Sequence, residues 1–344
     1  MRMKKATLHD VARLAGVSAG TVSKYINGKA IGEKNQYKIQ DAIERLDYSP
    51  SPLARNFASG KSYTLILYII AESPIISSTW QYELPIIHGI TDALKGSMYS
   101  LKIEIAAFQD FEENIRKLTM YAQNKYADGI ILLSPWHIDD DLLLPLQYHK
   151  LPYIVVGTCA QNCNHGYIDF DNEEPMRQIV RDMYAQGCRR FGMIGGFALQ
   201  RHMVCREQGF RATLAELGVP LHEKLICYTD YSLLEGYRVG MNMLSKELVP
   251  DAIVCGNDNI AAGVLRAIHE KGLKVPEDIV ISGFDDSVVS EACYPPITTV
   301  RVPAYDLGML AGSELMRSIE DDRYVIPNHL LKCDVEYKAS TRRK

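Results

Sequence analysis

The sequence predicts a small all-α head with a helix-turn-helix, followed by an α/β body of two doubly wound lobes of parallel sheet. Two patterns indicate this class. Helical spacing interrupted by a glycine turn occupies residues 1–49, and short apolar runs alternate with helical stretches through the rest of the chain. The body, at roughly 280 residues, exceeds the size that one hydrophobic core comfortably reaches. Two sheets are therefore expected.

Composition excludes several classes. With 47% hydrophobic and 23% charged residues, the chain is typical of a globular protein. Its longest apolar run, Leu65 to Ala71, is much shorter than the roughly 20 residues that a membrane helix needs. The basic start, residues 1–5, lacks an apolar leader, so a cytoplasmic location is expected. The eight cysteines form no CxxC pair, which favours reduced core thiols and predicts no metal and no cofactor.

Charge is unevenly distributed along the chain. Residues 1–61 contain eleven Lys or Arg and five Asp or Glu, a net charge of +6. Because the whole chain carries −4, the remaining residues carry −10. A basic head on an acidic body favours an anionic polymer as the partner of the head. A solvated basic surface without a binding partner would carry the same charge. The residue pattern of the head must therefore distinguish between the two interpretations.

The head begins with a capping pattern. Thr7 and Asp10 resemble a capping box that opens a helix. Gly16 supplies the positive φ that a sharp turn needs, and Ser18 can cap a second helix over 19–26. Two helices joined by a short glycine turn make a helix-turn-helix. The apolar spacing assigns core positions to Val11, Leu14 and Ala15 in the first helix, and to Ile39, Ala42, Ile43 and Leu46 in a third helix over 33–46.

The stretch TLHDVARLAGVSAGTVSKYING at 7–28, followed by AIERLDYSP at 42–50, resembles the head of LacI-type bacterial transcription regulators, the lactose and purine repressor family. The resemblance implies a periplasmic-binding-protein-like body, a homodimer, and a second helix that enters the major groove of a pseudo-palindromic DNA operator. The positions that it assigns to the major groove are Ser18, Ala19, Gly20, Thr21, Ser23, Lys24 and Asn27.

Few of these positions can read bases. Ala19 offers only apolar contact and Gly20 has no side chain, so direct readout is expected to rest on Lys24, which suits the acceptors of guanine. The short polar side chains are expected to bind phosphates and set the register; their alternative role is helix capping or surface solvation. Those side chains are Ser18, Thr21, Ser23 and Asn27.

A proline-rich elbow, YSPSP at 48–52, ends the head. Residues 53–60 after it resemble the family's hinge helix, which implies minor-groove contacts from Ala54 and Phe57. A phenylalanine can wedge between base steps and kink DNA. Alternatively, Phe57 packs the hinge on the body.

These features predict three segments: the helix-turn-helix at 1–49, the hinge at 50–62, and the effector-binding and dimerisation body at 63–344. The resemblance implies that the chain crosses between the lobes three times, and we expect the crossings near residues 160, 293 and 324. The expected ranges are about 63–160 and 294–323 for lobe 1, and about 161–292 and 324–344 for lobe 2.

Ligands of open α/β sheets bind beyond the carboxyl ends of the strands. At such places the resemblance implies effector contacts from Arg206, Asn257 and Asp285, whose donors and acceptors suit a polyhydroxylated ligand such as a sugar. The aromatic contacts that it implies, with rings that stack on a sugar or a purine, are Tyr231, Tyr82 and Trp80. Residues 72–82 replace the family's usual Asn-Pro-Phe-Phe-like loop, so effector identity is expected to differ there. Helix capping is the alternative for neighbouring Asp258 and Asp286.

No GxxxxGK or HExxH pattern occurs, so no enzyme is expected. The sequence predicts a repressor of carbohydrate-utilisation genes, associated with the nucleoid and controlled by a sugar or sugar derivative between the lobes. A phosphocarrier protein or a purine-type co-repressor is the alternative effector, and a solute-binding module is the alternative class. The sequence leaves open whether the effector induces or co-represses.

Overall fold

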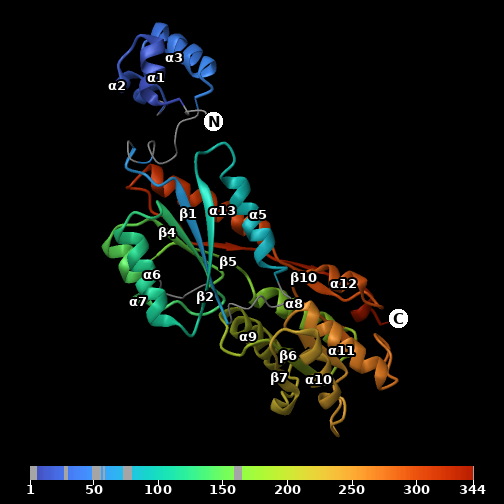
Figure 1. Cartoon of the computed structure of the whole chain (residues 1–344). Helices are drawn as coiled ribbons and strands as arrows, with labels where there is room; N and C mark the ends of the chain where they lie inside the picture. Colours follow the sequence, from blue (N-terminus) through green and yellow to red (C-terminus); the bar gives the residue numbers. More distant parts are fainter. Residues whose placement is uncertain are drawn as a thin grey trace. The chain divides into compact units, whose positions relative to one another are not determined.

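The computed structural model describes residues 6–26, 30–48, 56, 59–72, 80–158 and 165–343. The chain divides into two compact units (Figure 1). The first comprises residues 1–63 with 125–128, and the second comprises 64–124 with 129–344. None of the described helices is both long and apolar enough to cross a membrane.

The first unit is the predicted three-helix head, with α1 (Leu8–Ala15), α2 (Ala19–Ile26) and α3 (Glu33–Arg45). The capping box forms, because the Thr7 side chain accepts from the Asp10 amide and the Asp10 carboxylate accepts from the Thr7 amide. Gly16 ends α1 in the left-handed region with φ 65°. The buried core side chains are Val11, Ala12, Ala15, Val22, Ile39 and Ala42.

One core assignment in α1 was wrong. Leu14 is 47% exposed, whereas Ala12 is buried. Consecutive helix positions are 100° apart, so a face centred on Val11 and Ala15 has room for Ala12 on one side or Leu14 on the other. The other helices pack on the Ala12 side.

The second unit contains a six-stranded sheet in which every strand pair is parallel, in the order β11-β5-β4-β3-β1-β2. Helices lie on both of its faces (Figure 1), which explains the continuous apolar runs in β1 and β3. Its strands are β1 (Thr64–Ala71), β2 (Ser100–Ala107), β3 (Gly129–Leu133), β4 (Tyr153–Val156), β5 (Tyr167–Phe170) and β11 (His329–Leu331). Its helices are α5 (Glu83–Ala93), α6 (Phe111–Gln123), α7 (Asp140–Tyr148) and α13 (Ala304–Glu320).

A second parallel sheet has the order β7-β6-β8-β9, and an antiparallel pair joins β10 to β12. The prediction of two parallel-sheet lobes is therefore confirmed. The strands are β6 (Phe191–Gly195), β7 (Ile226–Tyr228), β8 (Ala252–Cys255), β9 (Val280–Ser282), β10 (Thr299–Arg301) and β12 (Asp334–Glu336). The helices of this part are α8 (Glu173–Ala185), α9 (Arg201–Glu216), α10 (Leu233–Met243), α11 (Asp258–Glu270) and α12 (Val288–Ala292).

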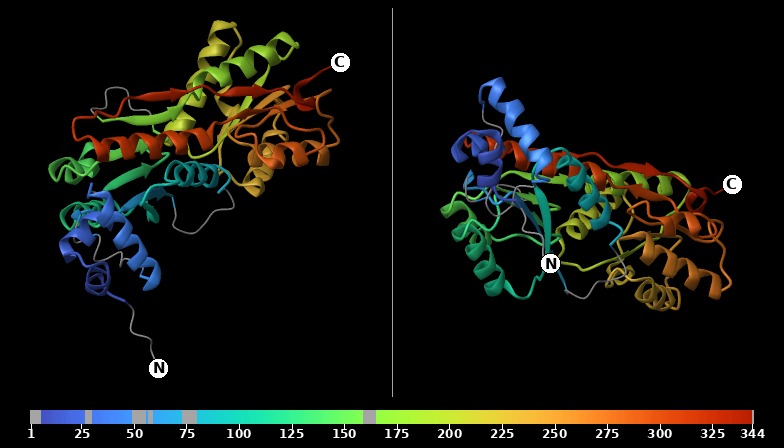
Figure 2. Two further views of the ribbon diagram at one scale, coloured as in Figure 1. Left: turned by 90° about the horizontal axis from the view of Figure 1, so that it is seen from above. Right: turned by 45° about the horizontal axis from the view of Figure 1, so that its top comes forward.

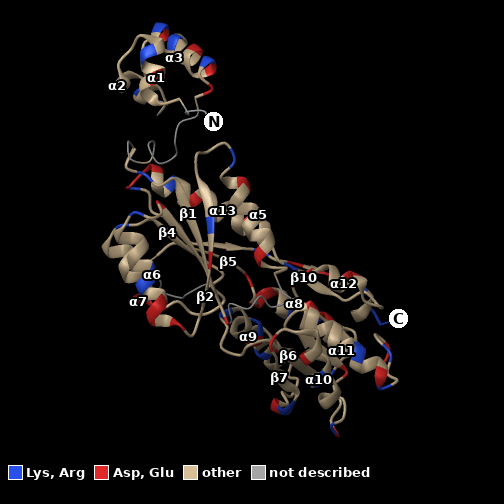
Figure 3. Ribbon diagram, viewed as in Figure 1, with Lys and Arg blue, Asp and Glu red and all other residues tan. Residues whose placement is uncertain are grey.

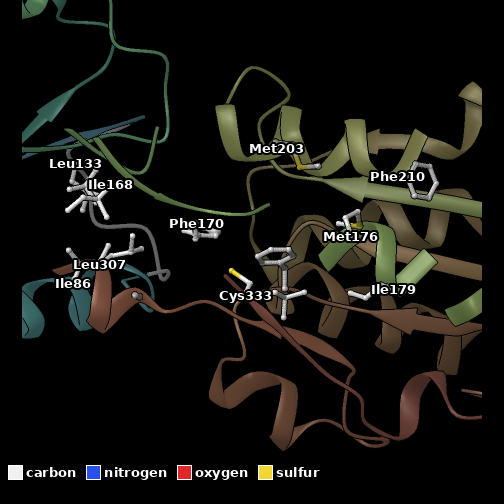
Figure 4. Packing of buried hydrophobic residues seen from close by; sticks show 14 of the residues in the cluster. Ile86, Leu133, Ile168, Phe170, Met176, Ile179, Met203, Phe210, Leu307 and Cys333 are labelled. Atoms are coloured by element: carbon white, nitrogen blue, oxygen red, sulfur yellow. The ribbon is translucent and has the colours of Figure 1, made fainter. Parts of the chain in front are cut away.

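The structure moves all three lobe boundaries. Strand β10 was expected in lobe 1, but it pairs with β12, and the preceding Thr298 bridges Ser282 of the second sheet. Strands β5 and β11 both belong to the six-stranded sheet, although the sequence analysis assigned residues 161–170 and 324–331 to lobe 2. The chain therefore leaves the first lobe beyond Phe170 and again beyond Leu331. Figure 4 shows Phe170 and Cys333 between the buried side chains of the two lobes, at these two connections.

Helices α5 and α13 pack closely, and they run side by side in both views of Figure 2. We expect Gly89→Ala to destabilise this pair by about 1–3 kcal/mol, the range for overpacked sites. A Cβ at Gly89 would overlap the backbone carbonyl oxygen of Tyr305, and one at Gly308 would overlap that of Ile86. Urea denaturation measures the effect. Ser313→Ala, at an exposed position of α13, is the control and should leave the unfolding free energy within about 0.5 kcal/mol; an equally small change in Gly89→Ala would contradict the close packing.

Candidate functional site

Helix α2 exposes one polar face. Ser18, Gly20 and Lys24 are exposed, while Val22 on the opposite side is fully buried in the head core. The Ser18 hydroxyl accepts from the Thr21 amide at 3.1 Å, and the two hydroxyl oxygens lie 2.8 Å apart. Both hydroxyls therefore serve the helix cap in the free protein, which is the alternative role named for them.

The rest of this face is nearly bare. A Cβ at Gly20 would have only the Ser18 Oγ near it, at 3.7 Å, so the fold does not require glycine there. A glycine on an exposed helix face allows another surface to approach the backbone closely. Lys24 stands one turn later, and Lys and Arg side chains also lie along the head helices beside acidic ones (Figure 3). Ala19 and Ser23 are half-buried. Asn27, Ala54 and Phe57 lie outside the described residues.

In the second unit, Arg206 lies on α9 and is buried. Its Nε donates to Asn172 Oδ1 at 2.9 Å and its Nη1 donates to the carbonyl oxygen of Gly256 at 2.6 Å. The guanidinium lies over the Phe284 ring, 3.5 Å from its centroid. These contacts fix the guanidinium plane and leave Nη2 directed toward Asp285, 3.9 Å away.

Asp285 sits in a loop at the carboxyl end of β9. Its φ is 103°, and its amide donates to the Val300 carbonyl oxygen at 2.9 Å. Positive φ is strained for a residue with a side chain, and such strain gathers at functional sites. Burial raises the pKa of the Asp285 carboxyl to about 7, and the nearby Arg206 only partly opposes the shift. The carboxyl therefore lacks a strong partner in the free protein.

Asn257 begins α11 as its N-cap. Its Oδ1 accepts from the Ile260 amide at 2.8 Å, and its Nδ2 donates to the Tyr231 carbonyl oxygen at 3.4 Å. The amide is therefore partly used by the fold. Neighbouring Asp258 is fully structural, since it accepts from the Thr299 hydroxyl at 2.6 Å and the Ser287 amide at 2.7 Å.

The Tyr231 ring lies directly on Gly196, where any Cβ would overlap the ring. Tyr231 has φ 65°, and its ring meets the edge of Phe197 at a centroid distance of 5.9 Å. Burial raises the pKa of its phenol to about 12. Gly196 therefore fixes the place of the ring.

We expect Gly196→Ala to weaken effector binding by about tenfold, because the methyl group would displace the Tyr231 ring. Tyr231→Phe keeps the ring and is the control, with a smaller loss. Calorimetric titration of the effector compares the two variants. Unchanged affinity in Gly196→Ala would remove Tyr231 from the site.

The first lobe contributes Tyr82, just before α5. Its ring meets the edges of Phe170 at 5.9 Å and of His202 at 6.0 Å between centroids. The hydroxyl is buried and has no hydrogen-bond partner among the described residues. Trp80 is partly buried against the same hydrophobic core. Burial raises the pKa of the Tyr82 phenol, and Asp169 of the same lobe, Arg206 and Asp285 also act on it. The structure thus brings Tyr82 together with Arg206 and Asp285 of the second lobe.

Further polar groups near this place were missed by the sequence analysis. Each has a buried polar atom without a hydrogen-bond partner in the described part of the chain. Such atoms are rare in folded proteins and costly, so a group of them favours a site that a ligand completes. No motif marks these residues, so nothing in the sequence singled them out. They are Glu83, Trp136, Thr158 and His202.

The two lobes touch beside these residues. Trp136 of the first lobe and Phe197 of the second have ring centroids 6.0 Å apart, and the Arg201 amide donates to the Pro135 carbonyl oxygen at 2.8 Å. Trp136 also stacks on Phe108 at 4.7 Å. A separate cavity of about 290 Å³ lies within the first lobe, beyond the carboxyl ends of β1, β2 and β3. Its lining includes Ile70, Phe108, Phe111, Asn114, Ser134 and Leu142. Within the described residues, no group of three His, Cys, Asp or Glu side chains is placed to hold a metal ion.

Comparison with known families explains why head and body occur together. Residues 7–51 match the family described as "Bacterial regulatory proteins, lacI family", and residues 180–341 match the "Periplasmic binding protein-like domain". The chain joins a LacI-family DNA-binding domain to a periplasmic-binding-protein-like domain. It is a DNA-binding transcription regulator and not an enzyme.

Relatives match the LacI-type chain over its whole length. Catabolite control protein A of Staphylococcus aureus is 28% identical over 337 residues, which cover 98% of this chain and 99% of the relative. The same protein of Priestia megaterium is 28% identical over 338 residues, with the same coverage.

Solved structures show the same architecture. A complex of the transcriptional regulator CelR with cellobiose is 27% identical, covers 97% of this chain and 99% of its own, and has a TM-score of 0.73. The lac repressor dimer bound to operator and the anti-inducer ONPF is 24% identical, with 98% and 99% coverage and a TM-score of 0.83. At that identity the second likeness concerns the fold alone.

Proposed function

We propose that this LacI-type chain is a homodimeric repressor of carbohydrate-utilisation genes, located in the cytoplasm and associated with the nucleoid. In this proposal a sugar or sugar derivative between the lobes controls operator binding. The observation that carries the proposal is the convergence of Arg206, Asp285 and Tyr231 with Tyr82 of the other lobe, in a chain that also has a recognition helix. CelR, with its cellobiose, supports a sugar as the ligand class.

For the DNA interface, we propose that α2 of each subunit enters one major groove of a pseudo-palindromic operator, with half-sites about one helical turn apart. Lys24 would contact bases, and the short polar side chains of α2, with Asn27, would contact phosphates. Ala54 and Phe57 would act in the minor groove. The exposed positions of Gly20 and Lys24 on one face support this assignment.

The effector would regulate operator binding by a population shift between lobe arrangements. A ligand changes an equilibrium only by binding one arrangement of the lobes more tightly than another. Here Tyr82 belongs to one lobe and Arg206, Tyr231 and Asp285 to the other, so a ligand that touches both discriminates between lobe arrangements. The contact between Trp136 and Phe197 would change with that arrangement.

Selection of sheared genomic DNA on the purified protein, at fixed salt, tests the proposal. One or a few sharp peaks over a pseudo-palindrome are expected, with genes of carbohydrate use beside them. Salt is fixed because phosphate contacts make affinity steeply salt-dependent. A flat profile, repeated with each candidate sugar present, would contradict a sequence-specific repressor.

The relatives named catabolite control protein A favour testing a second effector, a phosphocarrier protein. Calorimetry with sugars and with a purified phosphocarrier protein separates the two. Operator binding that responds to the protein alone would replace the sugar in the proposal.

A further inference from the structure

The charges around Tyr82 do not balance. Its buried hydroxyl lies within electrostatic reach of the carboxyls of Asp169, Glu83 and Asp285, but of only one guanidinium, Arg206. These side chains come from α5, β5, α9 and the loop after β9, so both lobes contribute. Three carboxyls thus face one permanent cation, and their full ionisation would leave an excess of negative charge.

Two of the groups are already engaged. Asp169 Oδ1 accepts from the Phe170 amide at 2.8 Å and lies 3.3 Å from His202 Nε2. Arg206 is held by Asn172 and by the Gly256 carbonyl oxygen, and it reaches Asp285 only at 3.9 Å. The carboxyls of Glu83 and Asp285 therefore remain without full compensation.

Glu83 is the least compensated group. It stands at the first residue of α5, and its Oε2 is buried with no hydrogen-bond partner among the described residues. Burial raises the pKa of its carboxyl to about 7. Burial is the main cause that raises the pKa of Asp285, and the charge of Glu83 adds to it, so the two carboxyls lie within electrostatic reach of each other.

A second observation points to a ligand at this place. Thr158, 3% exposed at the end of β4, has a buried hydroxyl without a hydrogen-bond partner in the described part of the chain. It follows Gly157, where a Cβ would lie 3.4 Å from the Tyr82 hydroxyl oxygen. Polar hydrogen-bonding capacity is thus unused beside the unbalanced carboxyls, as expected of a site that a polar ligand fills.

We propose that Glu83 and Asp285 together select an effector that carries a positively charged amine, with Glu83 as the specificity-determining residue. This inference rests on the proposed function, since it names the chemical class of the effector in that site. A neutral sugar can donate hydroxyl hydrogen bonds to both carboxylates but leaves their charge uncompensated in a buried place. An ammonium group supplies both the donors and the charge. It therefore recovers the free energy that ionising these two partly buried carboxyls costs the free protein.

The test uses matched probes on the full-length protein. D-glucosamine, D-glucose and N-acetyl-D-glucosamine differ at one carbon, and D-galactosamine with D-galactose repeats the comparison with another hydroxyl pattern. Calorimetric titration gives the affinities at fixed salt. We expect at least one amine to bind about tenfold or more tightly than its neutral partners.

Glu83→Gln removes the charge and nearly keeps the shape, and it is expected to reduce the preference to less than about twofold. Glu112→Gln is the matched control, because Glu112 is an exposed acid in the first turn of α6 on the same lobe. It should keep the full preference. The inference would be overturned if the neutral probes bind as tightly as the amines. It would also be overturned if the preference for the amine survives in Glu83→Gln, or if none of the amines binds.

Failure of the inference and failure of the proposed function give different results. A neutral sugar that releases or tightens operator binding leaves the proposed function standing and removes the amine. An amine that binds in a Glu83-dependent manner without any effect on operator binding supports the inference about the site and removes its regulatory role.

Discussion

Lys24→Ala is expected to weaken binding to the selected operator by about 1–3 kcal/mol, or roughly 5- to 150-fold, while non-specific DNA binding changes little. Lys24 is the only exposed long basic side chain in the described part of α2. Gly20, one turn earlier on the same face, has no side chain, and the hydroxyls of Ser18 and Thr21 are used by the helix cap. We therefore expect base discrimination by the described part of α2 to depend on Lys24. Fluorescence anisotropy with the operator and with a scrambled duplex measures both affinities.

Lys38→Ala is the matched control, since Lys38 is exposed on α3 of the same head. A lysine outside the recognition helix should affect the operator and the scrambled duplex equally. If Lys24→Ala likewise lowers both affinities equally, Lys24 is a phosphate contact, and base readout must come from elsewhere.

Strands β1 and β3, which stand out as apolar runs in the sequence, have both faces buried. β1 and β3 read as continuous apolar runs because helices cover the sheet on both sides. Strand β5, with the sequence YIDF, carries a polar Asp169, and β11 has only three residues, so neither stands out from a loop. Their place in the six-stranded sheet depends on pairing partners far along the chain, which a local pattern cannot show.

Some residues of the candidate site could likewise be predicted from the sequence, and others could not. Arg206 and Asp285 stand in motifs that could be matched, and the structure brings them within 3.9 Å. Glu83 stands in no motif, and only the packing of α5 shows that its carboxyl is buried without a partner. The sequence also could not separate Asp258 from Asp285 by chemistry. The Asp258 carboxylate already accepts hydrogen bonds from a hydroxyl and an amide. The Asp285 carboxyl has no strong partner.

Asp285→Asn is expected to abolish the effector response while operator affinity stays unchanged. Loss of a charged hydrogen bond to the ligand costs about 2 kcal/mol or more, which is roughly 30-fold in effector affinity. The fold should survive, because asparagine tolerates the positive φ of 103° and Arg206 keeps its bonds to Asn172 and Gly256. Operator release or tightening on titration with the effector is the measurement.

The adjacent residue provides the control. Asp286 also has positive φ, but its carboxylate is paired with Arg301 at 2.9 Å and with Lys338 at 3.2 Å. Asp286→Asn therefore removes ion pairs within the protein, but it does not remove a carboxyl that is available to the effector. The effector response of this variant should persist. A normal response in Asp285→Asn, or an equal loss in both variants, would remove Asp285 from the effector site and return it to the structural role that Asp258 has.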